Sequence, residues 1–344
     1  MRAAIYVDEG RIEAREIGVP SAGERDVLLK VRACGLCGTD IRKVRHHLIT
    51  PPTVLGHEVA GVVFSVGSEV TKFRAGDRVV VAHHTPCYVC HYCLHKNYSQ
   101  CHRFKESNLD PGGFAEYLRI PSSHVDHTAF KIPHGMTDDQ AIFMEPLACV
   151  LRNLKRTTLL DGDTVLVTGL GPMGILTGQA VRNSGCRVAA TDLREDRMDL
   201  ARRLGFESVI HASDPELKKK LLRMTEGRGA DLVVLTAGNA QTYADALQWV
   251  RNGGTINIFA SLGPGPRLAY EVEELYHREI TVFSSYSSSP SELAEALEEI
   301  RTGRINVDCL HPKPFGLDEV PSAIESVASL SILKAVIRPG GATS

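Results

Sequence analysis

Short apolar runs alternate with helix-like stretches between Asp163 and about Ser284, and this alternation limits the possible folds more than any other feature of the sequence. The runs read DTVLVTG, CRVAATD, DLVVLTAG, TINIFAS and ITVFSS, and each is short enough to be a buried strand. Strands that alternate with helices run parallel, because each helix returns the chain to the same edge of the sheet. The sequence therefore predicts a doubly wound parallel sheet over this segment.

A glycine-rich turn follows the first of these runs. In VLVTGLGPMG, Gly169, Gly171 and Gly174 stand between an apolar strand and a helix-like segment. The first glycine permits a tight turn, the second lets backbone N–H groups approach a pyrophosphate, and the third lets helix and strand pack closely. This context predicts a dinucleotide site, with a purely structural turn as the alternative. The predicted cofactor-binding set also contains Pro172, Met173, Arg197, Ala237, Ser261 and Ser285.

Asp192 ends the next predicted strand, 21 residues after Gly171. A carboxylate at this position accepts both adenosine ribose hydroxyls and repels a 2'-phosphate, which favours NAD over NADP. Arg194 and Arg197 are close in the sequence and weaken this preference, because arginine is what a 2'-phosphate requires. An ordinary helix N-cap is the alternative role for Asp192.

Four of the nine cysteines fall within fifteen positions. Cys87, Cys90, Cys93 and Cys101 have the spacing C-x2-C-x2-C-x7-C, which lets one short loop surround a metal with four thiolates. Four sulfur ligands and no open position are typical of a structural zinc site. An iron–sulfur cluster is the main alternative, but the final C-P of the ferredoxin pattern is missing. The segment from about 84 to 104 is therefore predicted to be a structural zinc lobe.

Length and charge narrow the remaining classes of protein. A chain of 344 residues favours two domains. A net charge of -2 gives no reason to expect nucleic acid or an anionic membrane as partner, and it argues against a free-standing zinc ribbon that binds nucleic acid. The N-terminal stretch lacks the apolar core of a signal peptide, and no apolar run is long enough to span a membrane. We therefore expect a cytoplasmic protein, in which the cysteines are metal ligands or small buried hydrophobic residues rather than members of disulfides.

The first 130 residues show a different pattern from the rest of the chain. Runs such as DVLLKVRAC, EVAGVVFSVG and DRVVVA lie between Gly, Pro and Asp turns, which predicts a mostly antiparallel β region. GHEVAG, the four-cysteine lobe, GGFAEY, EPLAC and GLGPMG occur in an order and spacing that resembles the zinc-dependent medium-chain dehydrogenases over essentially the whole chain. The polyol branch, typified by sorbitol dehydrogenase, is the most similar. The resemblance implies an α/β protein with a GroES-like catalytic domain, residues 1–146 and 285–344, and a doubly wound Rossmann domain that binds NAD, residues 147–284.

The resemblance also implies a second metal site. Carried over by motif, Cys37 and His57 bind a catalytic zinc, and Glu58 and Glu145 supply the remaining coordination, one directly and one through water. The expected content is thus two zinc ions per chain, one catalytic and one structural. Many alcohol dehydrogenases of the family have cysteine at the position of Glu145, and the harder carboxylate favours a substrate with vicinal hydroxyls.

Hydride transfer is the chemistry that this site implies. A zinc-bound substrate hydroxyl becomes more acidic, and its carbon passes hydride to the nicotinamide. Thr39 resembles the family's hydroxyl that starts a proton relay, and Asp40 resembles the carboxylate that orients the histidine ligand. Thr39, Asp40 and Glu58 form the predicted catalytic set.

One position departs from the family pattern. The relay often ends in a histidine five residues after the ligand cysteine, and here Arg42 occupies that position. Proton exit is therefore expected by way of water or Glu58. Both metal sites already have their ligands, so the other histidines, including His83 and His84, are expected to be surface or local structure.

The substrate is less constrained than the reaction. The leading hypothesis is oxidation of a secondary alcohol of a polyol, sugar or cyclitol to a ketone, by a homodimer or homotetramer. Alternatives are an L-threonine-type amino-alcohol dehydrogenase, a simple alcohol or aldehyde dehydrogenase, a zinc-free reductase and a non-enzymatic binding protein. The last two are disfavoured because the metal-binding residues and glycines are all present. The substrate pocket is expected around Thr39, Arg42, Phe104, Phe114, Arg152, Leu262 and Tyr286, and its two arginines suggest an anionic or phosphorylated substrate.

Overall fold

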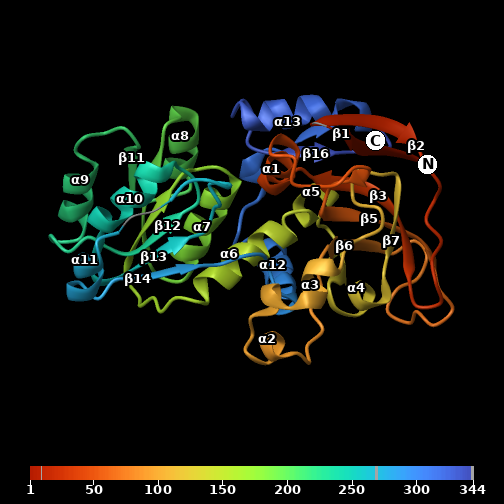
Figure 1. Ribbon diagram of the computed structural model, residues 1–344, viewed down its shortest axis with the longest axis horizontal. Coiled ribbons are helices and arrows are strands. Elements are labelled where there is room, and N and C mark those ends of the chain that lie inside the picture. Colours follow the sequence, from red (N-terminus) through yellow and green to blue (C-terminus); the bar gives the residue numbers. More distant parts are fainter. Residues whose placement is uncertain (9, 268–269, 342–344) are drawn as a thin grey trace. The chain divides into compact units, whose positions relative to one another are not determined.

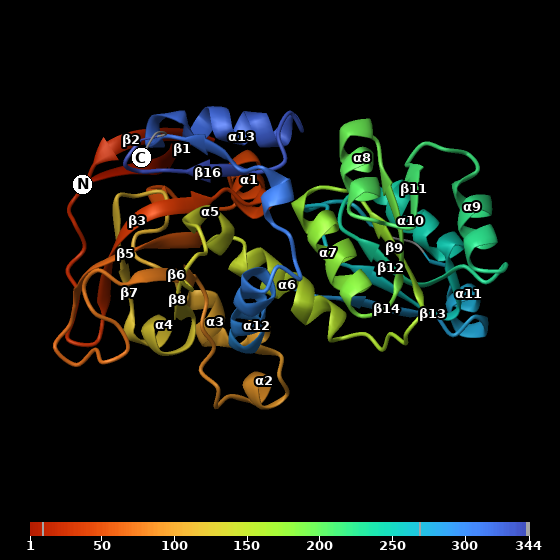
Figure 2. The same ribbon diagram turned by 180° about the vertical axis from the view of Figure 1, so that it is seen from behind.

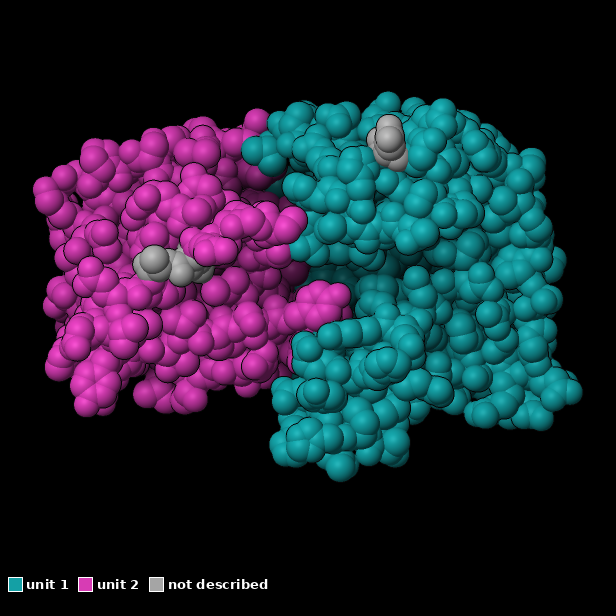
Figure 3. Space-filling model, viewed as in Figure 1, with its two compact units in different colours: residues 1–148, 288–303, 310–344 teal, residues 149–287, 304–309 magenta. Residues whose placement is uncertain are grey.

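The computed structural model describes residues 1–8, 10–267 and 270–341, and the chain divides into two compact units (Figure 3). Unit 1 consists of Met1–Ala148, Ser288–Gly303 and Leu310–Ser344, and unit 2 of Cys149–Ser287 and Arg304–Cys309. The sequence predicts boundaries after residues 146 and 284, and the two units divide after residues 148 and 287. The second segment of unit 2 is not predicted by the sequence. Side chains of the first segment hold it there: the amide of Gln179 bonds both backbone groups of Asn306, at 2.8 and 3.1 Å.

Unit 1 is built on antiparallel sheets, as the turn-rich sequence predicts (Figure 1). One sheet has the order β15-β16-β3-β5-β6-β8, with β7 also paired to β3, and a second has the order β2-β1-β4. The pair β15–β16 is the one parallel pairing described in this unit. The strands are β1 (Arg2–Asp8), β2 (Arg11–Glu16), β3 (Val27–Gly35), β4 (Thr53–Val54), β5 (Glu58–Val66), β6 (Arg78–Ala82), β7 (Tyr117–Ile120), β8 (Ala129–Lys131), β15 (Lys313–Phe315) and β16 (Ala335–Ile337).

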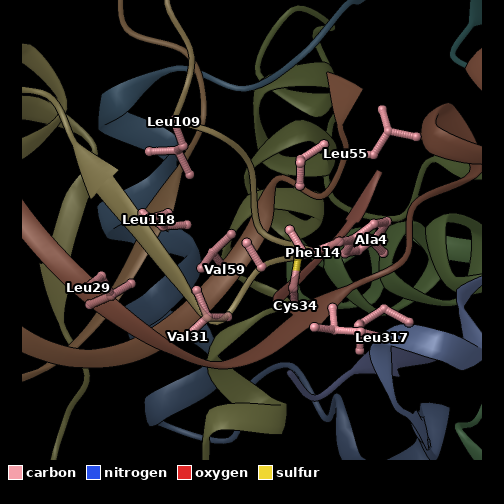
Figure 4. Close-up of a cluster of buried hydrophobic side chains, with 14 of the residues drawn as sticks. Ala4, Leu29, Val31, Cys34, Leu55, Val59, Leu109, Phe114, Leu118 and Leu317 are labelled. Carbon is pink, nitrogen blue, oxygen red and sulfur yellow. The ribbon is translucent and has the colours of Figure 1, made fainter. Parts of the chain in front are cut away.

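The core of unit 1 lies on the inner faces of these strands. Figure 4 shows Val31, Cys34, Val59 and Phe114 turned toward one another, and all four are buried. Val31 and Cys34 come from β3, Val59 comes from β5, and Phe114 comes from the segment before β7. Val31 and Cys34 are three residues apart, and the register of β3 against β5 shifts between Val31 and Ala33. The core therefore fixes β3 and β5 against each other, and their adjoining ends carry the candidate site.

Short helices connect and cover the strands of unit 1. A capping box opens one of them, at Thr137 and Gln140, as the sequence predicts. The boundary between the units falls within α6. The helices are α1 (Gly38–Arg45), α2 (His91–Leu94), α3 (His102–Glu106), α4 (Ser122–His127), α5 (Asp138–Ala141), α6 (Met144–Leu154), α12 (Pro290–Arg301) and α13 (Val320–Ala328), with short 3-10 turns η1 (Tyr98–Gln100), η2 (Asp308–Leu310) and η3 (Leu317–Glu319).

Unit 2 contains the predicted parallel sheet, with helices α7, α8 and α10 against it (Figures 1 and 2). Its order, β11-β10-β9-β12-β13-β14, is the 3-2-1-4-5-6 arrangement of the Rossmann fold, which confirms the prediction. The elements are β9 (Thr164–Thr168), β10 (Arg187–Asp192), β11 (Ser208–His211), β12 (Ala230–Leu235), β13 (Val250–Ile258), β14 (Thr281–Ser284), α7 (Pro172–Asn183), α8 (Glu195–Arg203), α9 (Leu217–Met224), α10 (Ala240–Trp249) and α11 (Val272–His277).

Within the described residues, the helices are all too short or too polar to cross a lipid bilayer.

Candidate active site and metal centres

The first metal-binding candidate, Cys37, is held by the start of α1. It is the N-cap of this helix, and its Sγ accepts the backbone N–H of Thr39 at 3.4 Å. The carboxylate of Asp40 in turn accepts the backbone N–H of Cys37 at 3.1 Å, which completes a capping box. The thiol is thereby fixed beside the end of β3, and Thr39 is left half-buried.

Strand pairing brings His57 and Glu58 to the same place. The last residue of β3, Gly35, pairs with Glu58, the first residue of β5. The ligand atoms of Cys37, His57 and Glu58 lie within 4.8 Å of one another. His57 is 6% exposed and Glu58 1% exposed. A buried group of one sulfur, one nitrogen and one carboxylate ligand fits a tetrahedral zinc site that keeps a position open.

Asp40 orients the histidine of this group. Its Oδ1 lies 3.2 Å from Nδ1 of His57, and both side chains are buried. Burial by itself disfavours the charged carboxylate, but His57, Lys43 and the backbone N–H of Cys37 together outweigh it and lower the pKa of Asp40 below its ordinary value. This contact lies on the Nδ1 side of the ring and leaves Nε2 of His57 for a metal; metal-binding histidines usually have a carboxylate in this place.

Lys334 forms a buried ion pair with Glu58 through Nζ and Oε2. It precedes β16, which lies next to β3 in the sheet. A Cβ at Gly35 would overlap the carboxylate of Glu58, so a glycine there makes room for the pair. Burial is the largest single influence and lowers the pKa of Lys334, but Glu58, Cys37 and Asp40 together raise it by more, and the lysine stays protonated. Sequence reasoning missed Lys334, because an isolated lysine carries no motif.

Glu145 lies buried near the start of α6. Among the described residues, the group within 4.8 Å contains Cys37, His57 and Glu58 without Glu145. Its place in the coordination of a metal therefore stays a prediction from the family resemblance.

The four-cysteine loop brings its thiols together as predicted. The sulfurs of Cys87, Cys90, Cys93 and Cys101 lie within 4.8 Å of one another, and the distance from Cys93 is 3.6 Å to Cys90 and 3.9 Å to Cys87. All four are free thiols. Backbone N–H groups of Val89 and Cys90 lower the pKa of Cys87 to about 6, which favours the thiolate that binds metal. This donor set fits a closed, four-sulfur zinc site.

The glycine turn of unit 2 has the geometry of a phosphate cradle. Gly169 has φ +86°, a conformation that favours glycine, and a Cβ there would overlap the Cβ of Ala237. Gly171 is the N-cap of α7, and Pro172 and Met173 form the first turn of this helix. A Cβ on Gly171 would have Arg197 Nη1 as its nearest neighbour, at 4.0 Å, so its outer side is open. Backbone N–H groups at this helix end are available to a pyrophosphate.

Asp192 ends β10 beside this turn. Its two carboxylate oxygens accept the backbone N–H groups of Leu170, at 2.6 Å, and Arg194, at 2.9 Å. Each oxygen keeps a further lone pair for a hydroxyl. The guanidinium of Arg194 is paired with the carboxylate of Asp196 at 3.0 Å.

Three more predicted cofactor residues follow strands of the same sheet. Ala237 comes after β12, Ser261 after β13 and Ser285 after β14. In a parallel sheet these positions share the edge at the carboxyl ends, where ligands of such folds bind. Ser285 is buried, and its Oγ has no hydrogen-bond partner in the described part of the chain.

Several expected pocket residues have structural roles instead. Phe114 is fully buried in the core of unit 1. Phe104 packs among the four cysteines. Arg152 donates to the carbonyl oxygens of Tyr286 and Ser287, at 2.5 and 3.0 Å. The two phenylalanines are therefore unsuited to contact a substrate, and Arg152 no longer argues for an anionic one.

His83 has a contact that sequence reasoning missed. It was expected to be surface or local structure, but its ring lies 4.4 Å from that of His57, measured between centroids. The pairing of Ala82 with Glu58 produces this contact. The signal available in the sequence was the strand DRVVVA just before it, but its register against EVAGVVFSVG could not be read from local pattern.

Comparisons with known proteins agree with this geometry. A family model described as alcohol dehydrogenase GroES-like domain matches residues 23–133, and one described as zinc-binding dehydrogenase matches residues 172–302. A sorbitol dehydrogenase from Halalkalibacterium halodurans is 30% identical over 96% of this chain and 96% of its own. An L-threonine 3-dehydrogenase from Pseudoalteromonas atlantica is 30% identical over 90% of this chain and 92% of its own.

A solved structure extends the similarity to three dimensions. It comes from Sinorhizobium meliloti 1021, is assigned as a zinc-binding dehydrogenase and is bound to NADP. The two chains are 29% identical and superpose with a TM-score of 0.89, over 98% of this chain and 99% of the other.

Proposed function

The chain belongs to the zinc-dependent medium-chain dehydrogenases, in their polyol branch, and on this premise we propose that it oxidises a secondary alcohol of a polyol, sugar or cyclitol to a ketone with NAD. The observation that carries the proposal is the group of Cys37, His57 and Glu58, in which the histidine and the glutamate are buried. Its mixed sulfur, nitrogen and oxygen ligands leave room for a substrate hydroxyl, in contrast to the closed four-cysteine site.

Residues of unit 1 have distinct tasks in this reaction. Zinc, when bound, acts as a Lewis acid on the substrate hydroxyl, and the nicotinamide accepts the hydride. Cys37 and His57 would hold the metal, and Asp40 keeps His57 in the tautomer that presents Nε2. Thr39 lies two residues after Cys37 and is half-buried, so its hydroxyl can accept the proton of the substrate hydroxyl while it passes its own proton on to water.

The preference for NAD is supported by the surroundings of Asp192. A fixed carboxylate at the end of β10 would repel a 2'-phosphate. The guanidinium of Arg194, which a 2'-phosphate would need, is engaged by Asp196. We therefore expect kcat/KM to be higher with NAD than with NADP, although a similar structure binds NADP.

We infer a homodimer or homotetramer, because β14 is an edge strand with an exposed, partly apolar surface. The balanced charge argues against nucleic acid and anionic membranes, and nine free cysteines support a reducing, cytoplasmic location.

An L-threonine dehydrogenase is the second candidate, because one relative of equal identity has that activity in its name. The initial rate of NADH formation by the zinc-loaded enzyme distinguishes the two. The panel contains polyols, cyclitols, sugar phosphates, L-threonine and simple primary alcohols. Preference for a vicinal secondary alcohol is the expected result. Preference for L-threonine or a primary alcohol would contradict the substrate class and leave the family unchanged.

Matched cysteine variants connect this activity to the proposed site. Cys37→Ser should lose one zinc per chain and nearly all turnover, because a hydroxyl replaces a thiolate ligand. Cys309→Ser is the control, since Cys309 lies in η2 outside both groups of ligands. Unchanged zinc content in Cys37→Ser would remove Cys37 from the metal site.

A further inference from the structure

The ring of His83 is placed beside the candidate metal site by strand register. Ala82, the last residue of β6, pairs with Glu58 in β5. Because these strands are antiparallel, His83, the residue after β6, lies opposite His57, the residue before β5. The ring centroids of His83 and His57 are 4.4 Å apart, with 39° between the planes. His83 therefore contacts a proposed metal ligand without itself belonging to the group of ligands.

The position of His83 is fixed by its neighbours. Nε2 of His124 donates to the carbonyl oxygen of His83 at 2.9 Å, and the ring of His84 lies 3.8 Å from that of His83. His84 is itself held by a 2.7 Å bond from Nδ1 to the carbonyl oxygen of Ser107. The backbone and the flanking ring thus hold His83, and its own ring nitrogens are not needed for this.

Neither ring nitrogen of His83 has a hydrogen-bond partner among the described residues. Nδ1 is buried without one, while Nε2 is not among the buried atoms and the residue is partly exposed. In contrast, a ring nitrogen of His84 bonds the carbonyl oxygen of Ser107, one of His124 bonds the carbonyl oxygen of His83, and Nδ1 of His57 lies 3.2 Å from the carboxylate of Asp40. A neutral imidazole has one N–H donor and one acceptor nitrogen. Next to a metal site it can therefore either donate a hydrogen bond to a ligand hydroxyl or accept one from it.

We propose that His83 determines specificity by binding the hydroxyl group adjacent to the reacting one, so that the enzyme selects vicinal diols over alcohols with a single hydroxyl. The inference rests on the proposed function and adds to it the residue that recognises the second hydroxyl. A site whose polar side chain hydrogen-bonds a substrate hydroxyl discriminates against an analogue without that hydroxyl, because the side chain is then left without a partner.

The test uses two substrates that differ by one hydroxyl, 2,3-butanediol and 2-butanol. In His83→Phe we expect kcat/KM for the diol to fall about tenfold, which corresponds to one hydrogen bond, and kcat/KM for 2-butanol to change less than about twofold. His83→Gln, whose amide can replace the exposed nitrogen, should recover most of the lost activity toward the diol.

A second measurement separates binding from turnover. The visible absorption of the cobalt-substituted enzyme is titrated with the diol, and His83→Phe should raise the dissociation constant about tenfold. His127→Phe is the matched control, because His127 is exposed and its ring contacts Tyr88 in the four-cysteine loop rather than His57. It should leave both substrates and the titration unchanged.

The outcomes distinguish this inference from the proposed function. An equal loss of both activities in His83→Phe would indicate a structural role, and no change in either would remove His83 from the substrate site. Both results overturn the inference and leave the dehydrogenase activity standing. A wild-type enzyme that oxidises L-threonine and neither alcohol would contradict the inference together with the proposed substrate class.

Discussion

At the scale of single residues, Lys334 and Glu58 form a charge pair with side chains 5% and 1% exposed. Removing one partner leaves an uncompensated buried charge, which typically costs about 3–5 kcal/mol. Lys334→Met should therefore lower the free energy of unfolding by about this amount at neutral pH, measured by urea denaturation of the metal-depleted protein. Lys313→Met removes an exposed lysine of the neighbouring strand β15 and should change stability by less than about 0.5 kcal/mol. Equal stability of the two variants would show that Glu58 does not depend on Lys334.

At the scale of an element, the start of α7 separates a folding role from a binding role within one glycine motif. A methyl group on Gly171 meets open space, whereas one on Gly174 overlaps the carbonyl oxygen of Gly169. Gly171→Ala should therefore keep the melting temperature and weaken NADH binding at least about tenfold, because the methyl group occupies the pyrophosphate approach. Gly174→Ala should lose about 1–3 kcal/mol of stability through overpacking. Fluorescence titration with NADH and thermal unfolding measure the two effects; normal NADH affinity in Gly171→Ala contradicts the cradle.

At the scale of the whole molecule, the edge of the unit 2 sheet predicts self-association. The residues Thr281 and Val282 of β14 are exposed, and Val272 and Tyr276 of the preceding helix are 78% and 75% exposed. An uncovered edge strand with apolar neighbours pairs readily with a second copy. Val282→Lys should shift the molar mass from dimer or tetramer toward monomer in light scattering coupled to size-exclusion chromatography. Leu160→Lys, an equally apolar exposed position before β9, is the control. A monomeric wild-type protein at micromolar concentration would contradict the proposal.

The two local motifs could be predicted from the sequence because their geometry is encoded in short spacing. The glycine turn and the four-cysteine loop each form within one connection, so residue identity and separation suffice. The buried group at Cys37 was reached through family resemblance, since its members come from different strands. Lys334 is 276 residues from Glu58, and His83 meets His57 only through the register of β5 and β6. Such contacts depend on long-range pairing, which no local pattern specifies.

Because β16 lies near the C-terminus, it determines when unit 1 can be completed during synthesis. Ribosomes produce this chain from its N-terminus, and domains generally fold as units as they emerge. Almost all of unit 2 is one continuous segment, but unit 1 needs β16 to pair with β3, and their residues are about three hundred positions apart. The nucleotide-binding half can therefore be complete while the half with the metal ligands still waits for its last strand. A truncated translation product that ends before Lys334 would contain a complete Rossmann sheet, but its Glu58 would have no countercharge. Cellular quality control would therefore encounter it as a partly folded protein.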